Sequence, residues 1–286
     1  MSWIVGKLGA GVDAAEVARL GKVHPAARQR VVTERLYVAA GGLAETCHAG
    51  TRPDGGGWAA VGTALARSGD AVSLLETAGW HALLAAPSPD LGGLDGSFAA
   101  VRWDGDGTLT ACVDPVGVRS FYVARTGDGV VFSTRLDWVC RLAGRGDVDF
   151  DQLGAHWLAF SQLAPRSLAA GVERLVQGAT ARCTAGTVAV RAKPWHPGSP
   201  DATPADVPPD LPARLAPFLH PRLAAPRRLS LGLSGGLDSR LLLALLLGGR
   251  PPHLHLFGAP DEPDVVVAKA IAAAEGLPQV HLVPDV

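Results

Sequence analysis

The stretch that most constrains the fold is Ser234-Gly235-Gly236-Leu237-Asp238-Ser239, which lies between two apolar runs. Leu229–Leu233 precedes it and the leucine-rich run Leu241–Leu247 follows it. This order predicts a strand, a tight turn and the start of a helix, which is an arrangement that binds anions. Two adjacent glycines let the backbone turn sharply and approach phosphate oxygens with no Cβ in the way. We therefore interpret the stretch as a pyrophosphate-binding loop with ATP as its ligand.

The side chains of this loop fit the same interpretation. Ser234 and Ser239 have hydroxyl groups that can donate to phosphate oxygens, and Asp238 can hold a Mg²⁺ ion that bridges phosphates. Amide groups and the helix dipole at the start of the helix add positive potential. The alternative is an ordinary Gly-Gly turn capped by Asp or Ser. Six fitting positions between a strand and a helix favour the binding loop.

Strands and helices alternate around and after the loop. We predict strands at Leu229–Leu233, His253–Phe257 and Val280–Val283, and helices at Ser239–Leu247 and Asp264–Glu275, ended by Gly248-Gly249 and Gly276. Such alternation predicts a parallel sheet that binds its ligand at the carboxyl ends of the strands. Phe257-Gly258 lies at one of these ends and is a candidate part of the adenine pocket. His253 and His255 share one face of their strand, but no third metal ligand accompanies them, which favours a structural role.

The first two thirds of the chain have a different pattern, in which short β-like runs are separated by turns. Ser97–Trp103 and Thr108–Val113 flank Asp104-Gly105-Asp106-Gly107, and Phe121–Ala124 and Val130–Ser133 flank Thr126-Gly127-Asp128-Gly129. Both arrangements predict hairpins. Asp104 and Asp106 have the spacing of the first two acidic ligands in a calcium-binding loop. The later acidic ligands are missing, so we interpret both as turn residues.

Helices are predicted at Asp13–Leu20 and Asp149–Phe160, because each opens with an acidic residue. Six tryptophans are predicted to pack in the core or at its edge rather than to form a recognition stripe, namely Trp3, Trp58, Trp80, Trp103, Trp138 and Trp157. A proline-rich segment carries Pro194, Pro197, Pro200, Pro204, Pro208, Pro209 and Pro212. Its density of proline excludes a regular helix and a central strand, and it predicts a linker. We therefore expect a first domain over 1–193, a linker over 194–212 and a second domain over 213–286.

Composition limits the class of protein. With 286 residues, 48% of them hydrophobic and 19% charged, the chain is long enough for about two globular domains. A net charge of −1 gives no electrostatic case for binding nucleic acid. The four cysteines, Cys47, Cys112, Cys140 and Cys183, lack metal-ligand spacing and are predicted to be isolated buried thiols. The N-terminus resembles no leader peptide and the Leu241–Leu247 run is too short to span a bilayer, so we expect a cytoplasmic protein with no membrane partner.

Several motifs together resemble the asparagine synthetase family. The glycine loop, His253–Phe257 with Gly258, the Pro263-Asp264 helix start and Gln279–Pro284 resemble the synthetase domain of glutamine-hydrolysing asparagine synthetases. Leu94–Ala99, Asp114–Arg119 followed by Phe121-Tyr122, and Phe132–Thr134 resemble motifs of the same family's N-terminal domain. The match covers about Leu91 to Val286, whereas the first ninety residues fit poorly.

This resemblance implies a two-domain fold that combines α/β and α+β architecture. An N-terminal Ntn-hydrolase-like αββα sandwich would precede part of an ATP-pyrophosphatase α/β domain with a parallel sheet. It also implies a reaction: a carboxylate attacks the α-phosphate of ATP, pyrophosphate leaves, and an amine displaces AMP to form an amide. Carried over to this chain, Leu233 and Phe257 would contact the nucleotide, and Asp238 would be a Mg²⁺ ligand. The residues expected to hold pyrophosphate are Ser234, Gly235, Gly236 and Ser239.

One departure from the family concerns glutamine hydrolysis. The family's nucleophile is a cysteine that becomes the first residue, but here Met1 is followed by Ser2. Ser2 is a weak candidate nucleophile, since serine fills that position in other Ntn hydrolases. The family's His-Arg-Gly-Pro-Asp and Asn-Gly-Glu signatures are missing, and Thr51–Asp54 is at most a remnant. We therefore expect a scaffold domain without glutaminase activity.

β-Lactam synthetases and lasso-peptide macrolactam cyclases share this loss, because their amine is already part of the substrate. Arg240 after the loop and the opening Trp3–Gly6 most resemble the cyclases. A specialised lactam-forming ligase that acts on a small-molecule or peptide carboxylate is therefore expected. Asparagine synthesis from ammonia or glutamine is the alternative.

The other departure is at the C-terminus. The acidic glycine-rich segment and the catalytic lysine of the family do not appear before Val286, and Lys7, Lys22, Lys193 and Lys269 match no such motif. We expect a truncated chain or one half of a split enzyme, with a second polypeptide that supplies the remaining catalytic residues. An inactive scaffold and a tRNA-modifying or nucleotide-amidating enzyme are further alternatives.

Overall fold

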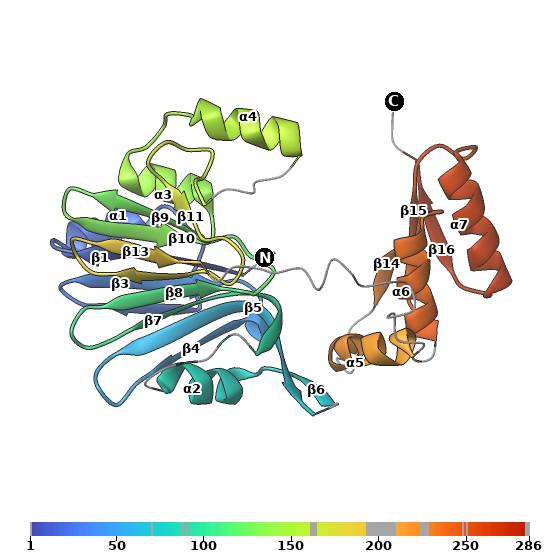
Figure 1. Cartoon of the computed structure of the whole chain (residues 1–286), viewed down its shortest axis with the longest axis horizontal. Helices are drawn as coiled ribbons and strands as arrows, with labels where there is room; N and C mark the ends of the chain where they lie inside the picture. Colours follow the sequence, from blue (N-terminus) through green and yellow to red (C-terminus); the bar gives the residue numbers. More distant parts are fainter. Residues whose placement is uncertain are drawn as a thin grey trace, which may run out of the picture. The chain divides into compact units, whose positions relative to one another are not determined.

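The computed structural model describes residues 2–69, 71–86, 89, 91, 93–160, 165–192, 210–223, 229–247, 249 and 251–283, with the side chains of 211, 212 and 220–223 left out. The chain divides into two compact units, residues 1–67 with 74–197 and residues 68–73 with 198–286. The first contains antiparallel sheets, and the second contains a parallel sheet (Figure 1).

A six-stranded antiparallel sheet forms one layer of the first unit, in the order β11-β9-β10-β1-β3-β2. Its strands are β1 (Trp3–Gly9), β2 (Gln29–Val32), β3 (Leu36–Gly41), β9 (Tyr122–Thr126), β10 (Gly129–Ser133) and β11 (Glu173–Arg174). Strand β1 lies near the middle, paired with β10 on one side and β3 on the other. Every residue of β1 and β3 is buried, because both faces of this sheet are covered.

The second sheet has seven strands, ordered β13-β12-β8-β7-β5-β4, with β6 also paired to β5. Its strands are β4 (Cys47–Thr51), β5 (Gly57–Ser68), β6 (Ala71–Leu74), β7 (Leu94–Trp103), β8 (Leu109–Val113), β12 (Thr180–Cys183) and β13 (Val188–Arg191). A 3₁₀ turn, η1 (Ala44–Thr46), leads into β4. Both predicted hairpins are confirmed: β7 pairs with β8, and β9 pairs with β10.

Three apolar clusters arrange the first unit as helix, sheet, sheet, helix. The central cluster takes residues from both sheets, such as Ile4, Val101 and Phe132. A second joins the outer face of the six-stranded sheet to α1 (Ala14–Gly21) and α3 (Leu136–Ala143). A third joins the outer face of the other sheet to α2 (Thr77–Ala85) through Trp80 and Phe98. The predicted four-layer αββα sandwich is confirmed.

Helix capping matches the predicted helix starts. The Asp13 carboxylate accepts a hydrogen bond from the Glu16 amide (2.8 Å) at the start of α1. The Asp149 carboxylate accepts one from the Gln152 amide (3.1 Å) at the start of α4 (Phe150–Ala159). Each bond satisfies an amide that the first helical turn leaves without a partner.

The second unit is a βαβαβ arrangement preceded by α5 (Leu211–Leu223). Parallel strands β14 (Ser230–Gly232), β15 (His253–Phe257) and β16 (Gln279–Leu282) lie side by side, connected by α6 (Leu237–Leu247) and α7 (Pro263–Ala274). Leu254 and Leu256 point from β15 into one cluster with Leu243 of α6 and Ala268 of α7. Both helices therefore cover the same face, and the predicted parallel alternation is confirmed.

Some expectations change. Trp157 is 77% exposed, so its predicted core role is wrong, whereas Trp3, Trp58, Trp80, Trp103 and Trp138 are buried. Cys112 and Cys183 are buried free thiols, but Cys47 and Cys140 are only half-buried. Most of the predicted linker, residues 194–209, lies outside the described residues. Pro212 belongs to α5 instead, since a first-turn proline needs no amide donor. Gly248 and Pro284 also lie outside the described residues.

Candidate functional site

The glycine loop connects the end of β14 at Gly232 to the start of α6 at Leu237. Beside it, residues 258–262 connect the end of β15 to α7. Because the strands are parallel, both loops lie at the same carboxyl edge of the sheet. The Leu233 amide still donates to the His255 carbonyl (2.9 Å), which fixes the start of the loop to β15.

Gly235 lies against the first turn of α7. A Cβ built on Gly235 would be 2.7 Å from Asp264 Oδ1 and 3.0 Å from Asp264 Cα, which is closer than a side chain tolerates. A Cβ on Gly236 would meet only Ser234 Oγ, at 3.1 Å. The close approach of the two loops therefore requires glycine at 235 and is more permissive at 236.

The two serines of the loop hold it closed. Ser239 Oγ accepts a hydrogen bond from the Ser234 amide (3.1 Å) and lies 3.1 Å from Ser234 Oγ. Ser234 Oγ accepts a hydrogen bond from the Gly236 amide (3.1 Å). Arg240 Nε donates to the Gly236 carbonyl (3.1 Å). These bonds give the loop a defined shape, and its serine hydroxyls and amides are the groups that an anion would engage.

Acidic side chains surround this loop. Asp238 and Asp264 are exposed in the first turns of α6 and α7. Glu262 caps the neighbouring loop, where its carboxylate accepts from the Ala259 amide (3.0 Å). Among the described residues no cluster of three His, Cys, Asp or Glu side chains is placed to hold a metal ion. The arrangement nevertheless fits Mg²⁺, which takes one or two carboxylates and completes its shell with water and phosphate oxygens.

The apolar candidates have different environments. Phe257 is 63% exposed at the end of β15, where a base could stack on its ring. The side chain of Leu233 is buried with Leu254 and Leu256. Only the backbone of Leu233 is therefore available for the predicted contact with the nucleotide. His255 Nδ1 lies 2.7 Å from Ser230 Oγ, which gives it the structural partner expected for it. His253 is exposed.

Three contributors to the site were not identified as such from the sequence. Asp264 was predicted only as a helix start, and neither Glu262 nor the His281–Gly258 contact was predicted. His281 Nε2 lies 2.9 Å from the Gly258 carbonyl. The signal for Asp264 was its position after the second parallel strand, since the turns that follow such strands meet at one edge.

Ser2 lies in the first unit, where it is buried immediately before β1. Its Oγ is 2.5 Å from Thr46 Oγ1 and accepts from the Leu43 amide (3.2 Å), while Arg119 donates to its carbonyl. A Cβ on Gly42 would be 2.5 Å from Ser2 Oγ. The hydroxyl is therefore enclosed by Thr46, the Leu43 amide and Gly42.

None of the four cysteines has the environment of an activated nucleophile. Burial raises the pKa of the Cys112 and Cys183 thiols to about 12. Burial also raises the pKa of the Cys47 and Cys140 thiols. Because the thiolate is the reactive form, all four are expected to be inert near neutral pH.

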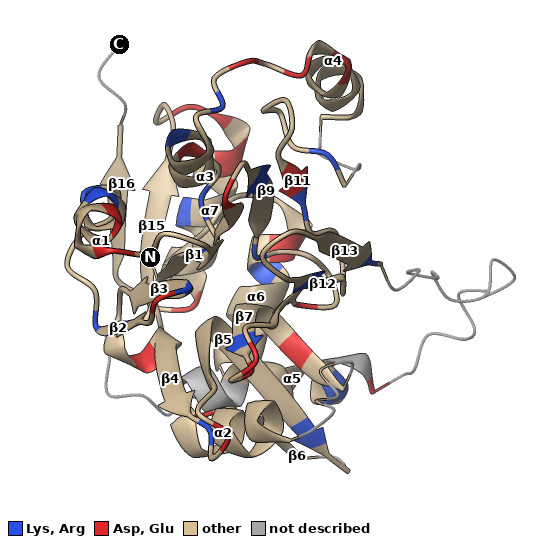
Figure 2. Cartoon of the chain, turned by 90° about the vertical axis from the view of Figure 1, so that its left-hand side faces the viewer, with Lys and Arg blue, Asp and Glu red and all other residues tan. Residues whose placement is uncertain are grey.

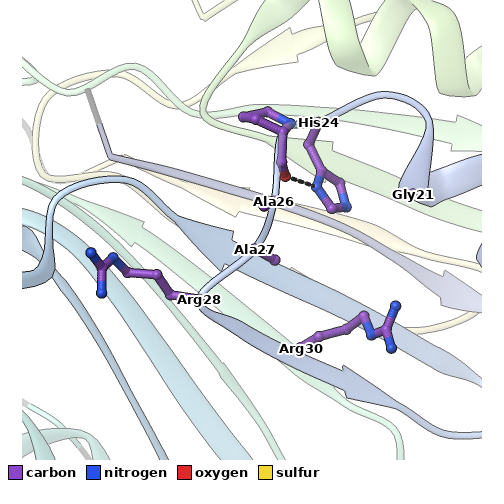
Figure 3. Close-up of a pocket in the computed structure, with 7 residues that line it drawn as sticks. Gly21, His24, Ala26, Ala27, Arg28 and Arg30 are labelled. Atoms are coloured by element: carbon purple, nitrogen blue, oxygen red, sulfur yellow. Dashed lines mark hydrogen bonds between the residues drawn. The ribbon is translucent and has the colours of Figure 1, made fainter.

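A hollow of about 500 Å³ lies beside the segment that leads into β2. Figure 3 shows His24, Arg28 and Arg30 at its lining, with His24 Nδ1 2.7 Å from the Pro25 carbonyl. Arg28 Nε donates to the Gly42 carbonyl (2.6 Å), and His24 Nε2 lies 2.7 Å from the Tyr37 hydroxyl. The lining contains two guanidinium groups and no carboxylate, so it favours an anion over a cation.

Comparison with known proteins gives a distant likeness only. No protein-family model matches the chain, and no curated protein matches it. One similar solved structure is an allosteric regulatory enzyme of purine biosynthesis, with a TM-score of 0.37 and 11% identity over 97% of this chain and 58% of that one. Another is glutamine phosphoribosylpyrophosphate amidotransferase from B. subtilis, with a TM-score of 0.36 and 12% identity over 97% of this chain and 59% of that one. The chain thus spans less than two thirds of the length of these proteins. The fold given above is assigned from the strand order and the apolar clusters of this chain alone.

Within the part of the chain that the structure describes, no helix combines the length and apolar character needed to cross a bilayer.

Proposed function

We propose that the chain is the ATP-binding part of an AMP-forming amide ligase of the asparagine synthetase type. The observation that supports this most is the contact of the glycine loop with the first turn of α7 at Gly235 and Asp264, at the carboxyl edge of a parallel sheet. This edge is where α/β sheets bind nucleotides. The motifs on both sides of the loop give the same family resemblance.

In the proposed reaction the loop binds the triphosphate of ATP. Amides of the loop and of the first turn of α6 point at the β- and γ-phosphates, and the hydroxyls of Ser234 and Ser239 turn from each other toward phosphate oxygens. Asp238 would hold Mg²⁺, which would supply positive charge beside the pyrophosphate leaving group. Phe257 provides a face for the base. A carboxylate oxygen attacks the α-phosphorus, and an amine then attacks the acyl carbon and releases AMP.

The first unit is proposed to be a scaffold without glutaminase activity. Its cysteine thiols have raised pKa values, and Ser2 Oγ is held by Thr46 and the Leu43 amide. An enzyme without glutaminase needs an amine from another source. We therefore propose a substrate that contains both the carboxylate and the amine, which makes the product a lactam or macrolactam.

The test is the binding of ATP by the 286-residue chain, measured by isothermal titration calorimetry with and without Mg²⁺. We expect Mg²⁺-dependent binding that Asp238→Ala weakens at least tenfold, the loss of about 1.4 kcal/mol of binding free energy. Glu275→Ala is the matched control, because Glu275 caps the opposite end of α7, roughly 18 Å along the helix. Equal affinities of wild type and Asp238→Ala would exclude Asp238 from the site.

Catalysis is tested by exchange of labelled pyrophosphate into ATP. We expect exchange that depends on an added carboxylate and disappears in Asp238→Ala. Exchange that is unchanged in this variant would remove the loop from the reaction.

A further inference from the structure

Helix α4 is amphipathic in the opposite sense to an ordinary surface helix. Surface helices bury their apolar stripe and expose their polar face. In α4 the half-buried positions are the polar Gln152 and His156, and no residue of the helix is buried. Five large apolar residues are exposed in and just after this helix: Phe150 (76%), Leu153 (39%), Trp157 (77%), Leu158 (83%) and Phe160 (92%).

These five residues, which we call the α4 face, lie on one side of the helix. At 100° per residue the four that belong to the helix, Phe150, Leu153, Trp157 and Leu158, span an arc of roughly 140° centred close to Phe150, and Gln152 and His156 lie outside it. Gly154 falls inside the same arc. Phe160, just beyond the last turn, has a left-handed backbone (φ 50°). A non-glycine residue seldom adopts that conformation. The exposed Phe160 side chain adds a further aromatic ring to the apolar residues of the helix.

The helix is held in place from its N-terminal end. The Asp149 amide donates to the Leu168 carbonyl and the Ala170 amide to the Asp147 carbonyl, both at 2.9 Å, around a bridge between Val148 and Ala169. Arg166 adds an ion pair with Asp149 at 3.5 Å. Figures 1 and 2 show α4 beyond α3, on the side away from the sheets. The α4 face is therefore presented by an anchored helix, and no described core cluster includes it.

The area of the α4 face fits a symmetric dimer. Aromatic side chains bury 150–250 Å² each, so the exposures of these five side chains correspond to roughly 700 Å² of apolar surface per copy. Two copies would bury about 1,400 Å², within the range of about 1,200–2,000 Å² found for stable interfaces. Two-fold symmetry places the same face on both partners, and Gly154 permits close approach of the two helices.

The charges around the helix argue against a lipid surface. Asp151 is the only Asp, Glu, Lys or Arg within α4, and the capping Asp149 is paired with Arg166. Figure 2 shows red at its start and tan along most of its length. Helices that lie on membranes carry basic residues to meet anionic headgroups, and this helix offers the opposite charge.

We propose that the α4 face is a homodimer interface, with Trp157 at its centre and Phe150, Leu153, Leu158 and Phe160 around it. This inference concerns assembly and does not depend on the ligase activity. Trp157 is the expected hot spot, since buried tryptophans dominate interface energetics.

The test is the molar mass of the full chain in solution, measured by size-exclusion chromatography with light scattering from about 1 to about 100 µM. We expect the mass to rise to twice the 29.5 kDa of one chain. Trp157→Asp should raise the dissociation constant by a factor on the order of 30 or more. Val116→Asp is the matched control, because Val116 is 63% exposed between β8 and β9, outside the α4 face, and its replacement should leave the dimer intact.

Trp157 is exposed, so its replacement should leave the fold intact, which circular dichroism checks. Phe150→Ser is a second variant with the same expected effect. A monomer at every concentration would overturn the proposal, as would a dimer that both variants leave unchanged. Monomers whose binding to phosphatidylcholine–phosphatidylglycerol vesicles is lost in Trp157→Asp would also overturn it and assign the face to lipid.

Discussion

A buried charge cluster in the first unit gives a stability prediction with a defined magnitude. Lys7 of β1 is 3% exposed, and its Nζ lies 2.9 Å from Glu16 Oε1 and 2.6 Å from Asp128 Oδ2. Arg19 Nε donates to Glu16 Oε2 at 2.6 Å. The hydrogen bond from Arg19, followed by that from Lys7, lowers the pKa of Glu16 from 4.5 to about 2. We predict that Glu16→Gln destabilises the fold at neutral pH.

The magnitude follows from the change in pKa. At about 1.36 kcal/mol per pKa unit, the shift of Glu16 corresponds to roughly 3 kcal/mol of unfolding free energy. The folded-state pKa lies below the unfolded one, so this contribution is complete above pH 4.5 and is lost as the pH falls toward 2. The difference between wild type and Glu16→Gln should therefore be largest at neutral pH and shrink on acidification.

The assay is urea unfolding followed by tryptophan fluorescence at several pH values, because Trp3 and Trp138 pack in the cluster that covers this face of the sheet. Glu34→Gln is the control, since Glu34 is exposed in the turn between β2 and β3. A difference that stays constant from neutral pH to pH 2.5, or that is absent at neutral pH, would refute the assignment of this stability to Glu16.

Further predictions concern the two candidate sites. Gly235→Ala should weaken ATP binding about tenfold or more, because the new Cβ would meet Asp264. Gly236→Ala should have a smaller effect, because its Cβ would not. Calorimetry on both variants measures the difference, and equal losses of affinity would contradict the contact with Asp264. Ser239→Ala removes the partner of the Ser234 amide, so hydrogen exchange of that amide should become faster by roughly a factor of five or more; unchanged exchange would show that the serine pair does not hold the loop. Finally, the chain should release no glutamate from glutamine, and Ser2→Ala should leave that background unchanged; release abolished by this substitution would restore Ser2 as a nucleophile.

Local chemistry in the sequence predicted several elements well. The strand at His253–Phe257 has its predicted bounds, since a short apolar run ends there at glycine. The hairpin between β7 and β8 followed from Asp104–Gly107, whose residues suit a turn and little else. The aspartates at positions 13 and 149 cap the helices that they predict.

The rest depends on tertiary context. Strands β1 and β3 are covered on both faces, so their residues do not alternate between apolar and polar, and the first ninety residues gave little signal. Trp157 was misassigned because a helical pattern shows an apolar face but not the direction in which it points. The proximity of Gly235 to Asp264 joins residues from different loops, and only the packing of α7 on the sheet brings them together.

The central claim is that the loop from Leu233 to Ser239 binds the phosphates of ATP. Hydrogen–deuterium exchange with mass spectrometry tests it most directly, on the full chain with and without saturating Mg²⁺–ATP. The account predicts slower exchange in peptides covering residues 233–240 and 258–264 and no change in β1 or β3. Protection at the arginine-lined hollow of residues 24–30 instead, or no protection of the glycine loop at saturating nucleotide, would contradict it.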